Sequence, residues 1–321
     1  MRAGAFRAGD RVIVRSREEI LSTLDADGTL DGLPFMPEML DWCGKPFRVE
    51  RRAEKTCVDV AAPVLPNRRF PANDVVFLDG PRCDGRGHDG CKRGCKIFWK
   101  ADWLRPFDSV DASAQTSGTE LDELLPRLKT KSDEDHYFCQ STQLAKATEA
   151  FPGSQKLWRL RIFVREIQNG DRSVAEILKL LALWSWQRSL RLLHGEPWLR
   201  GPHERTPAVS LGLKPGDAVR IKSRAEVEAT LNPGGSNRGL KVCYEMTRYC
   251  GREAEVRDRV DRIIDERTGK MRELRNTVTL RNIRGKTPAV GDAECLCADE
   301  TGDCPRGDLM YWREIWLERG G

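Results

Sequence analysis

The sequence has no long apolar run and few histidines. No segment approaches the roughly 20 apolar residues that a membrane-spanning helix needs, and the start, MRAGAFRAGDRVIV, lacks the apolar core of a signal peptide. Histidine occurs 4 times in 321 residues, and we find no phosphate-binding glycine loop, no H-E-x-x-H helix and no Ser-His-Asp or Cys-His order. We therefore expect a cytoplasmic protein that has no membrane partner and carries none of these catalytic motifs.

The chain also lacks blocks of one charge. Its 54 Lys and Arg residues and 49 Asp and Glu residues leave a net charge of +5, with the two signs mixed along the chain. A nucleic-acid partner usually requires a concentrated basic face, so the composition argues against one. With 39% hydrophobic and 32% charged residues, the composition is that of an ordinary globular protein.

What the sequence does contain is an internal repeat. Residues 6–44 align without a gap to residues 213–251, with 15 of 39 positions identical. The similarity resumes where FWKADWLRP (98–106) matches YWREIWLER (311–319). Each repeat is then about 105 residues long, an ordinary size for a domain.

The repeats divide the chain into three parts. We predict an N-terminal Cys-rich β unit over 1–107, a linker and helical segment over 108–210, and a C-terminal β unit over 211–321 that is a degenerate copy of the first. The middle part begins with polar residues and continues into a helical pattern that opens at Ser173-x-x-Glu176.

Both repeats have the same local pattern. The capping boxes Ser16-x-x-Glu19 and Ser223-x-x-Glu226 predict a short helix at the same place in each. Other apolar runs are typical of strands: FRVER, DVVFL and IFWKADWL in the first repeat, and AEVRDRV, TVTLR and MYWREIWL in the second. The expected fold class is mostly β with α, as two small SH3-like β-barrels flanking a helical middle, although another small β-sheet fold would leave the same pattern.

Eleven cysteines are present, and they cluster. The stretch RCDGRGHDGCKRGCKIFWK (82–100) holds Cys83, Cys91, Cys95 and His88 within 13 residues. Because disulfides are rare in the cytosol, an odd and clustered set of cysteines favours metal ligation.

We predict a metal site in the first repeat. Its proposed ligands are Cys57, Cys83, Cys91 and Cys95, with His88 as a substitute ligand or an outer hydrogen-bond donor. Four thiolates suit either zinc or an iron–sulfur cluster, and the surrounding glycines and cations would help both, so the spacings leave the two metals equally open. A reactive thiol without metal and a loop of unrelated free cysteines are the alternatives.

Two further positions are shared by the repeats. Cys43 and Cys250 each precede a glycine, which predicts a buried structural thiol and a glycine that turns the chain. Glu38 and Glu245 also match, and a solvated carboxylate is the default expectation for them.

The second repeat keeps only part of the cysteine set. Cys95 and Cys57 align with Asp308 and Ile264, so we expect this repeat to have lost the metal. The alternative is another site made from a different set: Cys295, Cys297, Cys304 and either Asp308 or Cys243.

Several blocks carry a resemblance to a known family: FMPEMLDWCGKPFRVERRAEKTC, RCDGRGHDGCKRGCKIFWKADWL, HYFCQSTQLAKAT, YCGREAEVRDRVDRIIDERTGKM and CPRGDLMYWREIWLER. The chain resembles an uncharacterised bacterial family of Cys-containing proteins with duplicated domains. Its genes accompany those of specialised-metabolite or polysaccharide biosynthesis. The resemblance implies a biosynthetic partner protein or small molecule, adds Cys139 to the candidate ligands, and brings no activity with it.

Three functions are consistent with these features. The first is a metal-binding (iron–sulfur or zinc) accessory or redox protein of a biosynthetic pathway. The second is a metal-dependent enzyme acting on a small molecule between the two β units, with His88, His136 or a glutamate as general base. The third is a protein or nucleic-acid binding adaptor, which rests on analogy between small barrels alone.

Overall fold

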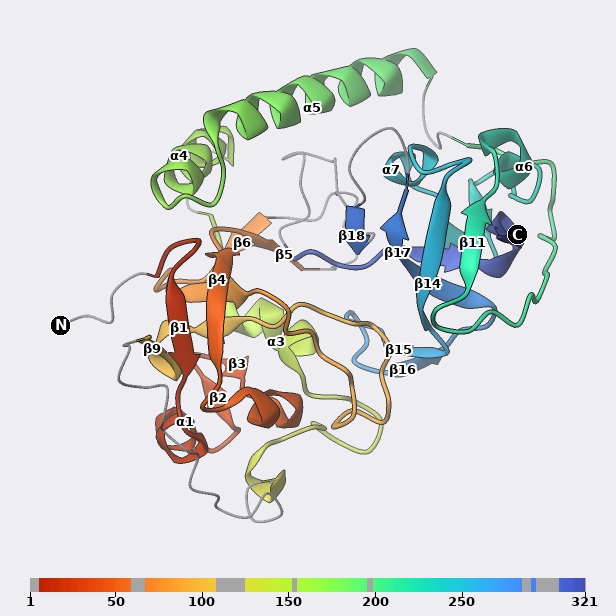
Figure 1. Ribbon diagram of the computed structural model, residues 1–321. Coiled ribbons are helices and arrows are strands. Elements are labelled where there is room, and N and C mark those ends of the chain that lie inside the picture. The colour runs from red at the N-terminus through yellow and green to blue at the C-terminus, as the bar shows by residue number, and fades with distance from the viewer. Residues whose placement is uncertain are drawn as a thin grey trace. The chain divides into compact units, whose positions relative to one another are not determined.

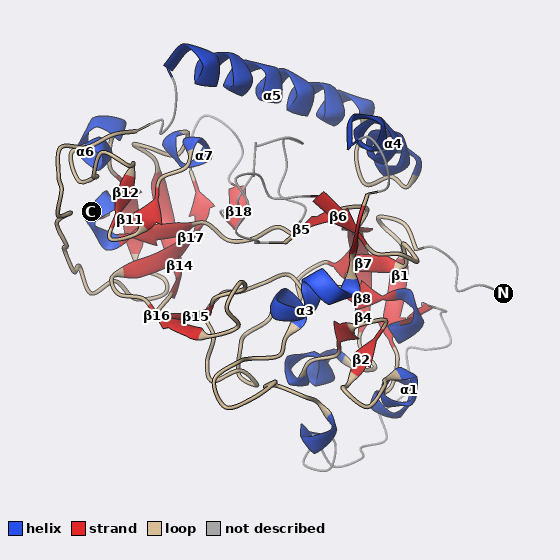
Figure 2. Ribbon diagram, turned by 180° about the vertical axis from the view of Figure 1, so that it is seen from behind, coloured by secondary structure: helices blue, strands red, loops and turns tan. Residues whose placement is uncertain are grey.

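The computed structural model describes residues 6–58, 67–107, 125–151, 155–194, 199–284, 290–292 and 306–320. Its elements are mostly short antiparallel strands, accompanied by a few helices (Figure 1, Figure 2). The chain forms two compact units: unit 1 contains residues 1–178 and 264–271, and unit 2 contains residues 179–263 and 272–321. The middle segment of the sequence is therefore divided between them. Within the described ranges, no helix is long and apolar enough to cross a membrane.

Unit 1 is built on a five-stranded antiparallel sheet. Its order is β8-β7-β4-β1-β9, with β1 (Arg11–Val14), β4 (Pro46–Arg52), β7 (Val75–Leu78), β8 (Trp99–Lys100) and β9 (Leu104–Pro106). Helix α1 (Arg17–Thr23) follows β1 and begins at Ser16, whose hydroxyl accepts from Glu19 N at 3.2 Å while Ser16 N donates to the Glu19 carboxylate at 2.9 Å. The predicted capping box is confirmed.

Unit 2 contains a sheet with a closely similar order. It runs β18-β17-β14-β11-β20, with β19 also paired to β17: β11 (Ala218–Ile221), β14 (Glu253–Arg259), β17 (Thr277–Ile283), β18 (Val290–Asp292), β19 (Tyr311–Arg313) and β20 (Leu317–Arg319). The path β19-β17-β14-β11-β20 thus has the order of the first sheet. The second predicted capping box is confirmed at Ser223, where α6 (Arg224–Glu228) begins.

Matching details occur in both sheets. The ladder shifts register between Val49 and Arg51 in β4 and between Val256 and Asp258 in β14, at aligned positions. The indole N–H of Trp103 donates to the Thr23 hydroxyl at 3.2 Å, and that of Trp316 donates to the Thr230 hydroxyl at 3.0 Å. These aligned residues therefore form the same contacts in each unit.

The last predicted strand of each repeat is broken in two. IFWKADWL forms β8, the 3₁₀ helix η2 (Ala101–Trp103) and the start of β9, and MYWREIWL forms β19, η5 (Glu314–Trp316) and the start of β20. The break is needed because β8 pairs with β7 whereas β9 pairs with β1, at the other side of the sheet. A straight strand could not pair with both.

Shorter elements complete unit 1. They are β2 (Thr29–Leu30), β3 (Leu33–Pro34), η1 (Pro37–Trp42), β5 (Thr56–Cys57), β6 (Asn67–Arg69), η4 (Leu125–Arg127), α3 (Gln140–Ala147), β10 (Glu149–Ala150) and α4 (Gln155–Gln168).

Helix α5 (Val174–His194) begins in unit 1 and continues into unit 2, and its predicted capping box is confirmed by the Ser173 N bond to Glu176 at 2.7 Å. Unit 2 also contains β12 (Ser236–Asn237), β13 (Leu240–Lys241), α7 (Tyr244–Thr247), β15 (Arg262–Ile264) and β16 (Met271–Glu273). The tip of the β15–β16 hairpin, residues 264–271, belongs to unit 1.

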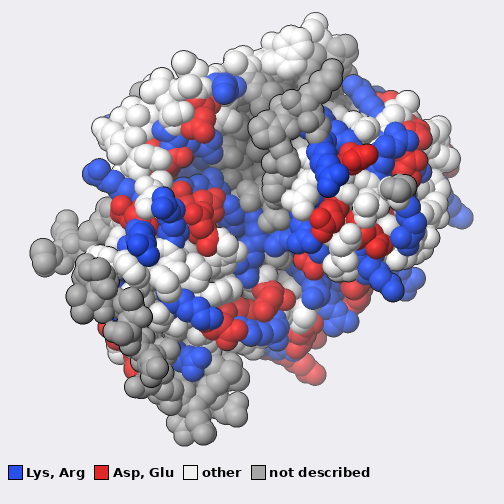
Figure 3. All heavy atoms as spheres, viewed as in Figure 1, with Lys and Arg blue, Asp and Glu red and all other residues white. Residues whose placement is uncertain are grey.

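Each unit has its own aromatic core. Trp99 and Trp103 are fully buried in unit 1, and the ring of Phe35 meets that of Trp103 edge to face at 5.3 Å. Trp312 and Trp316 are buried at the aligned positions of unit 2. Figure 3 shows Lys and Arg interspersed with Asp and Glu over the visible face, as the mixed composition leads one to expect.

Candidate functional site

The cysteine-rich loop is closed at its base by backbone bonds. An isolated antiparallel bridge joins Arg82 to Lys96, and Cys83 N donates to Cys95 O at 2.9 Å. The side chain of Arg82 also donates to Gly94 O at 2.9 Å. Cys83 and Cys95, twelve positions apart in the sequence, therefore lie side by side.

Gly85 folds the loop back onto its third cysteine. It has φ +71°, and a Cβ at this position would lie 2.0 Å from the carbonyl oxygen of Cys91. Its own carbonyl accepts from His88 N at 2.9 Å and from Gly90 N at 3.0 Å. Only glycine allows this close approach, which brings Cys91 against the backbone two residues after Cys83.

A fourth cysteine comes from the start of α3. Cys139 is the N-cap of this helix and is 8% exposed. The next residue, Gln140, makes two bonds to Phe98: its Oε1 accepts from Phe98 N and its Nε2 donates to Phe98 O, both at 2.9 Å. The thiol of Cys95 lies 3.5 Å from the hydroxyl of Ser141. Residues 139–141 therefore pack on the end of the cysteine loop.

The four thiols influence one another electrostatically. Burial raises the pKa of Cys83 well above its ordinary value, and charge on Glu38, then on Cys95 and Cys139, raises it further. Burial also raises the pKa of Cys139 to about 12, and charge on Cys95 and Cys91 contributes to that rise. The pKa of Cys91 is raised by burial and then by Cys95. Charge on Cys95 therefore contributes to the raised pKa of each of the other three thiols.

The tip of the β15–β16 hairpin covers this cluster within unit 1. Ile264 N donates to the sulfur of Cys91 at 3.4 Å. Glu266, almost fully buried, accepts from the guanidinium of Arg93 at 3.0 Å. Further along, Tyr137 N donates to Gly269 O at 2.8 Å. The loop, residues 137–141 and residues 264–269 therefore meet in unit 1.

His88 occupies a buried ion pair beside the thiols. It is 1% exposed; its Nδ1 lies 2.7 Å from Oε1 of Glu38, and its Nε2 lies 3.1 Å from Phe138 O. Burial lowers the pKa of His88, but the hydrogen bond and charge of Glu38 outweigh it and the net shift is upward. With both ring nitrogens engaged, His88 acts as a hydrogen-bond donor in this structure and has no free nitrogen to ligate a metal.

The expectation of a solvated carboxylate at Glu38 is wrong, since its side chain is fully buried. The residue lies in η1, where its Oε1 also accepts from Gly87 N at 3.1 Å, and among the described residues Oε2 has no hydrogen-bond partner. The signal in the sequence was the match between Glu38 and Glu245 in the two repeats. The side chain of Glu245 lies outside the described residues.

The other predicted cysteines of unit 1 are Cys57 and Cys43, and both are buried. Cys57 is buried in β5, opposite Asn67 of β6. Cys43 is buried and followed by Gly44 at φ +76°, which confirms its predicted structural role. Three cysteines predicted as an alternative site lie outside the described residues: Cys295, Cys297 and Cys304.

No metal-ligand geometry is preformed in the described parts of the chain, where no three His, Cys, Asp or Glu side chains are arranged to hold an ion. The eight described cysteines are free thiols and form no disulfide.

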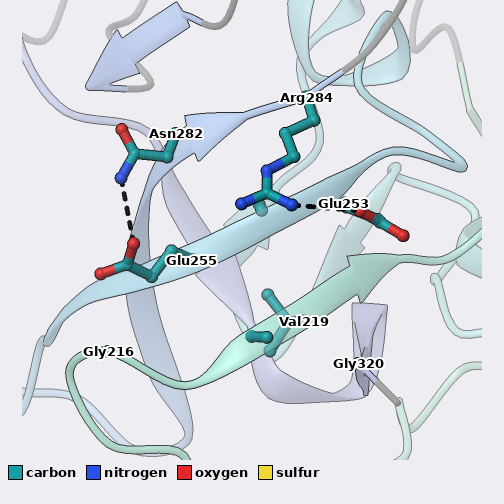
Figure 4. Close-up of a pocket in the computed structure, with 9 residues that line it drawn as sticks. Gly216, Val219, Glu253, Glu255, Asn282, Arg284 and Gly320 are labelled. Atoms are coloured by element: carbon teal, nitrogen blue, oxygen red, sulfur yellow. Dashed lines mark hydrogen bonds and ion pairs between the residues drawn. The ribbon is translucent and has the colours of Figure 1, made fainter.

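One pocket of unit 2 lies on its sheet (Figure 4). It measures about 230 Å³, and its polar groups pair with one another: Asn282 donates to Glu255 at 3.0 Å, and Arg284 lies 3.9 Å from Glu253. Both members of the second pair are about 70% exposed or more. The pocket therefore presents a solvated, self-neutralised surface.

Comparison of the chain with protein-family models, curated proteins and solved structures finds no match. The function must therefore be inferred from the geometry itself.

Proposed function

We propose that unit 1 is a metal-binding module in which the thiols of Cys83, Cys91, Cys95 and Cys139 hold one zinc ion or one iron–sulfur cluster. The observation that supports it is the meeting of four free cysteines from two distant segments around one loop. In this proposal the fourth ligand is Cys139 and not Cys57, which was the ligand predicted from the sequence.

The donor set suits a soft metal. Four thiols are the ligands that structural zinc and iron–sulfur clusters require. Binding would need rotation of the cysteine side chains towards a common point, since the described side chains do not already form a ligand group. The raised pKa values of Cys83 and Cys139 mean that a bound metal would displace protons from them.

Neighbouring groups would fix the loop rather than ligate. His88 and Glu38 tie the loop to η1, and the Phe138 carbonyl ties the same imidazole to the residue before Cys139. Such outer contacts orient metal ligands in many proteins. A metal here would join the loop to the start of α3, and a cluster could pass electrons to a biosynthetic partner.

Metal analysis of the full-length protein, purified anaerobically, tests this function. We expect zinc or iron near one site per chain, and an absorption band in the visible if a cluster is bound. Cys139→Ser should lose most of the metal. The matched control is Cys250→Ser, because Cys250 is a half-buried free thiol of unit 2. This variant should keep its metal.

The variant Cys57→Ser separates the two ligand sets. Metal lost from Cys57→Ser but kept by Cys139→Ser would support the set predicted from the sequence. A wild-type protein that binds neither zinc nor iron would contradict metal binding altogether.

We also infer that each sheet is an SH3-like barrel and that the two arose by duplication. The order β8-β7-β4-β1-β9, with η2 joining β8 to β9 in the chain, is the arrangement of SH3-like barrels. The path β19-β17-β14-β11-β20, with η5 joining β19 to β20, repeats it. The aligned bulges and Trp–Thr bonds support this inference. The fold by itself assigns no function.

A further inference from the structure

Each sheet buries one cation directly after a buried tryptophan. In unit 1 it is Lys100, which is 1% exposed and follows Trp99 in β8. Its ammonium is neutralised by two carboxylates, that of Asp31 at 2.7 Å and that of Asp74 at 3.2 Å. The charge is therefore paired, as buried charges usually are.

In unit 2 the same position holds Arg313, which is 6% exposed and follows Trp312 in β19. Its guanidinium donates to neutral acceptors only: Arg275 O at 2.8 Å, Arg238 O at 2.7 Å, Asn237 O at 3.3 Å and the Thr277 hydroxyl at 2.7 Å. In the part of the chain that the structure describes, no carboxylate pairs with it.

Unit 2 has other residues at the positions of the two carboxylates, Asp31 and Asp74, that neutralise Lys100 in unit 1. Arg238 aligns with Asp31, and both have positive φ in the same short hairpin, +47° and +51°. Thr277 pairs with Arg313 as Val75 pairs with Lys100. Asn276, which precedes Thr277, is therefore the equivalent in unit 2 of Asp74, which precedes Val75. One anion has thus become a cation and the other a neutral amide.

Further positive charge surrounds Arg313. Burial lowers its pKa, and the charges of Arg238 and Arg272 lower it further. The side chains of Arg238 and Arg272 are exposed, and within the described ranges neither forms an ion pair. A guanidinium stays charged under these conditions, so the site holds positive charge that no described side chain neutralises.

A pocket opens onto this charge. It measures about 80 Å³ and is lined among others by Gly239, Leu240, Arg272, Thr277, Tyr311 and Arg313. At about 30 Å³ per water molecule, this space corresponds to two or three waters. It is large enough for a small ion and too small for a planar cofactor.

We propose that this pocket binds a small oxyanion, namely phosphate or the phosphate group of a small phosphomonoester. Arg272 and Arg313 line the pocket, and Arg238 precedes the lining residue Gly239 and accepts from Arg313 through its carbonyl oxygen. Guanidinium groups bind phosphate through paired, charge-assisted hydrogen bonds, which makes phosphate the anion best matched to several arginines at one place. This proposal is independent of the metal site in unit 1.

Calorimetric titration of the full-length protein with sodium phosphate, at an ionic strength held constant with chloride, tests the proposal. We expect saturable binding and a higher melting temperature with phosphate. Arg238→Asp, which restores the carboxylate that Asp31 supplies in unit 1, should weaken binding at least tenfold without lowering the melting temperature in chloride. Arg272→Ala should weaken binding about tenfold.

Arg284→Ala is the control, because Arg284 is an exposed cation of unit 2 outside this pocket. It should bind phosphate as the wild type does. Equal weakening by Arg284→Ala and Arg272→Ala would reveal general charge attraction and overturn the proposal, as would absence of phosphate binding to the wild type.

Two further ligands identify the source of the phosphate. Binding of phenyl phosphate at least as tight as that of inorganic phosphate would assign a phosphomonoester, and binding of inorganic phosphate alone would assign the free ion. Binding of a DNA or RNA duplex that Arg238→Asp abolishes, with no binding of either small ligand, would replace the proposal with a nucleic-acid site.

Discussion

The buried pair of His88 and Glu38 allows a sharp test, because the chain contains an exposed pair with the same geometry. Nδ1 of His88 and Oε1 of Glu38 are 2.7 Å apart, with side chains 1% and 0% exposed. Nδ1 of His136 and Oδ1 of Asp133 are also 2.7 Å apart, but their side chains are 41% and 60% exposed. The two pairs differ in burial rather than in distance.

The two alanine variants should therefore differ widely. His88→Ala leaves the Glu38 carboxylate buried without its imidazole partner, and removing one partner of a buried pair costs about 3–5 kcal/mol. His136→Ala removes an exposed pair worth about 0–1 kcal/mol. For a unit of this size, about 3 kcal/mol corresponds to a melting temperature lower by about 6–12 °C.

The effect should also depend on pH. Burial lowers the pKa of His88, but Glu38 raises it, and the net pKa lies above the ordinary 6.5. The stability that charged His88 contributes is therefore complete below pH 6.5 and is lost as pH rises through the raised pKa of the folded protein. Burial raises the pKa of Glu38, but His88 lowers it below 4.5, so its contribution is present above 4.5 and is lost as pH falls through the lowered value. The variant should differ most from the wild type between about pH 4.5 and 6.5.

Differential scanning calorimetry across this pH range measures the effect, and hydrogen exchange of residues 82–100 locates it. His88→Gln, which keeps a neutral donor, should recover part of the loss. The reasoning would be refuted by similar melting temperatures for His88→Ala and His136→Ala, or by a His88→Ala effect of equal size at pH 6 and pH 9.

Three further outcomes are expected. Asp171→Asn should raise the melting temperature more at pH 8 than at pH 4. Burial raises the pKa of Asp171 to about 6, so the charged carboxylate lowers the stability of the folded protein as pH rises through that value. An equal rise in melting temperature at both pH values would contradict this. Ser16→Ala should lower stability by about 1 kcal/mol and speed hydrogen exchange in α1, by loss of the N-cap. Leu144→Ala, at a fully buried site of α3, should cost about 2–5 kcal/mol by calorimetry, and a cost below 1 kcal/mol would show that α3 is not anchored there.

Short-range features of the fold were predictable. The helices after Ser16, Ser173 and Ser223 begin where their capping boxes place them, because each box joins residues only three positions apart. The strands Pro46–Arg52 and Thr277–Ile283 follow from short apolar and alternating runs.

Features that join distant strands were not predictable. The split of IFWKADWL into β8, η2 and β9 depends on which strands its two halves pair with, and nothing within those eight residues specifies that. The burial of Glu38 depends in the same way on His88, fifty positions later. A carboxylate is expected in solvent until its partner is known.

By itself the sequence determined the repeat, the caps, the strands and the cysteine-rich loop, because these are properties of residues close together or of two aligned segments. Only the tertiary structure decided that the start of α3, which includes Cys139, packs on the end of the cysteine loop, because that contact joins a loop to a helix more than forty positions away. It also decided that the buried Arg313 lacks the carboxylates that neutralise Lys100. The sequence shows these substitutions, but only the packing of hairpin, strand and sheet edge places them around one buried charge.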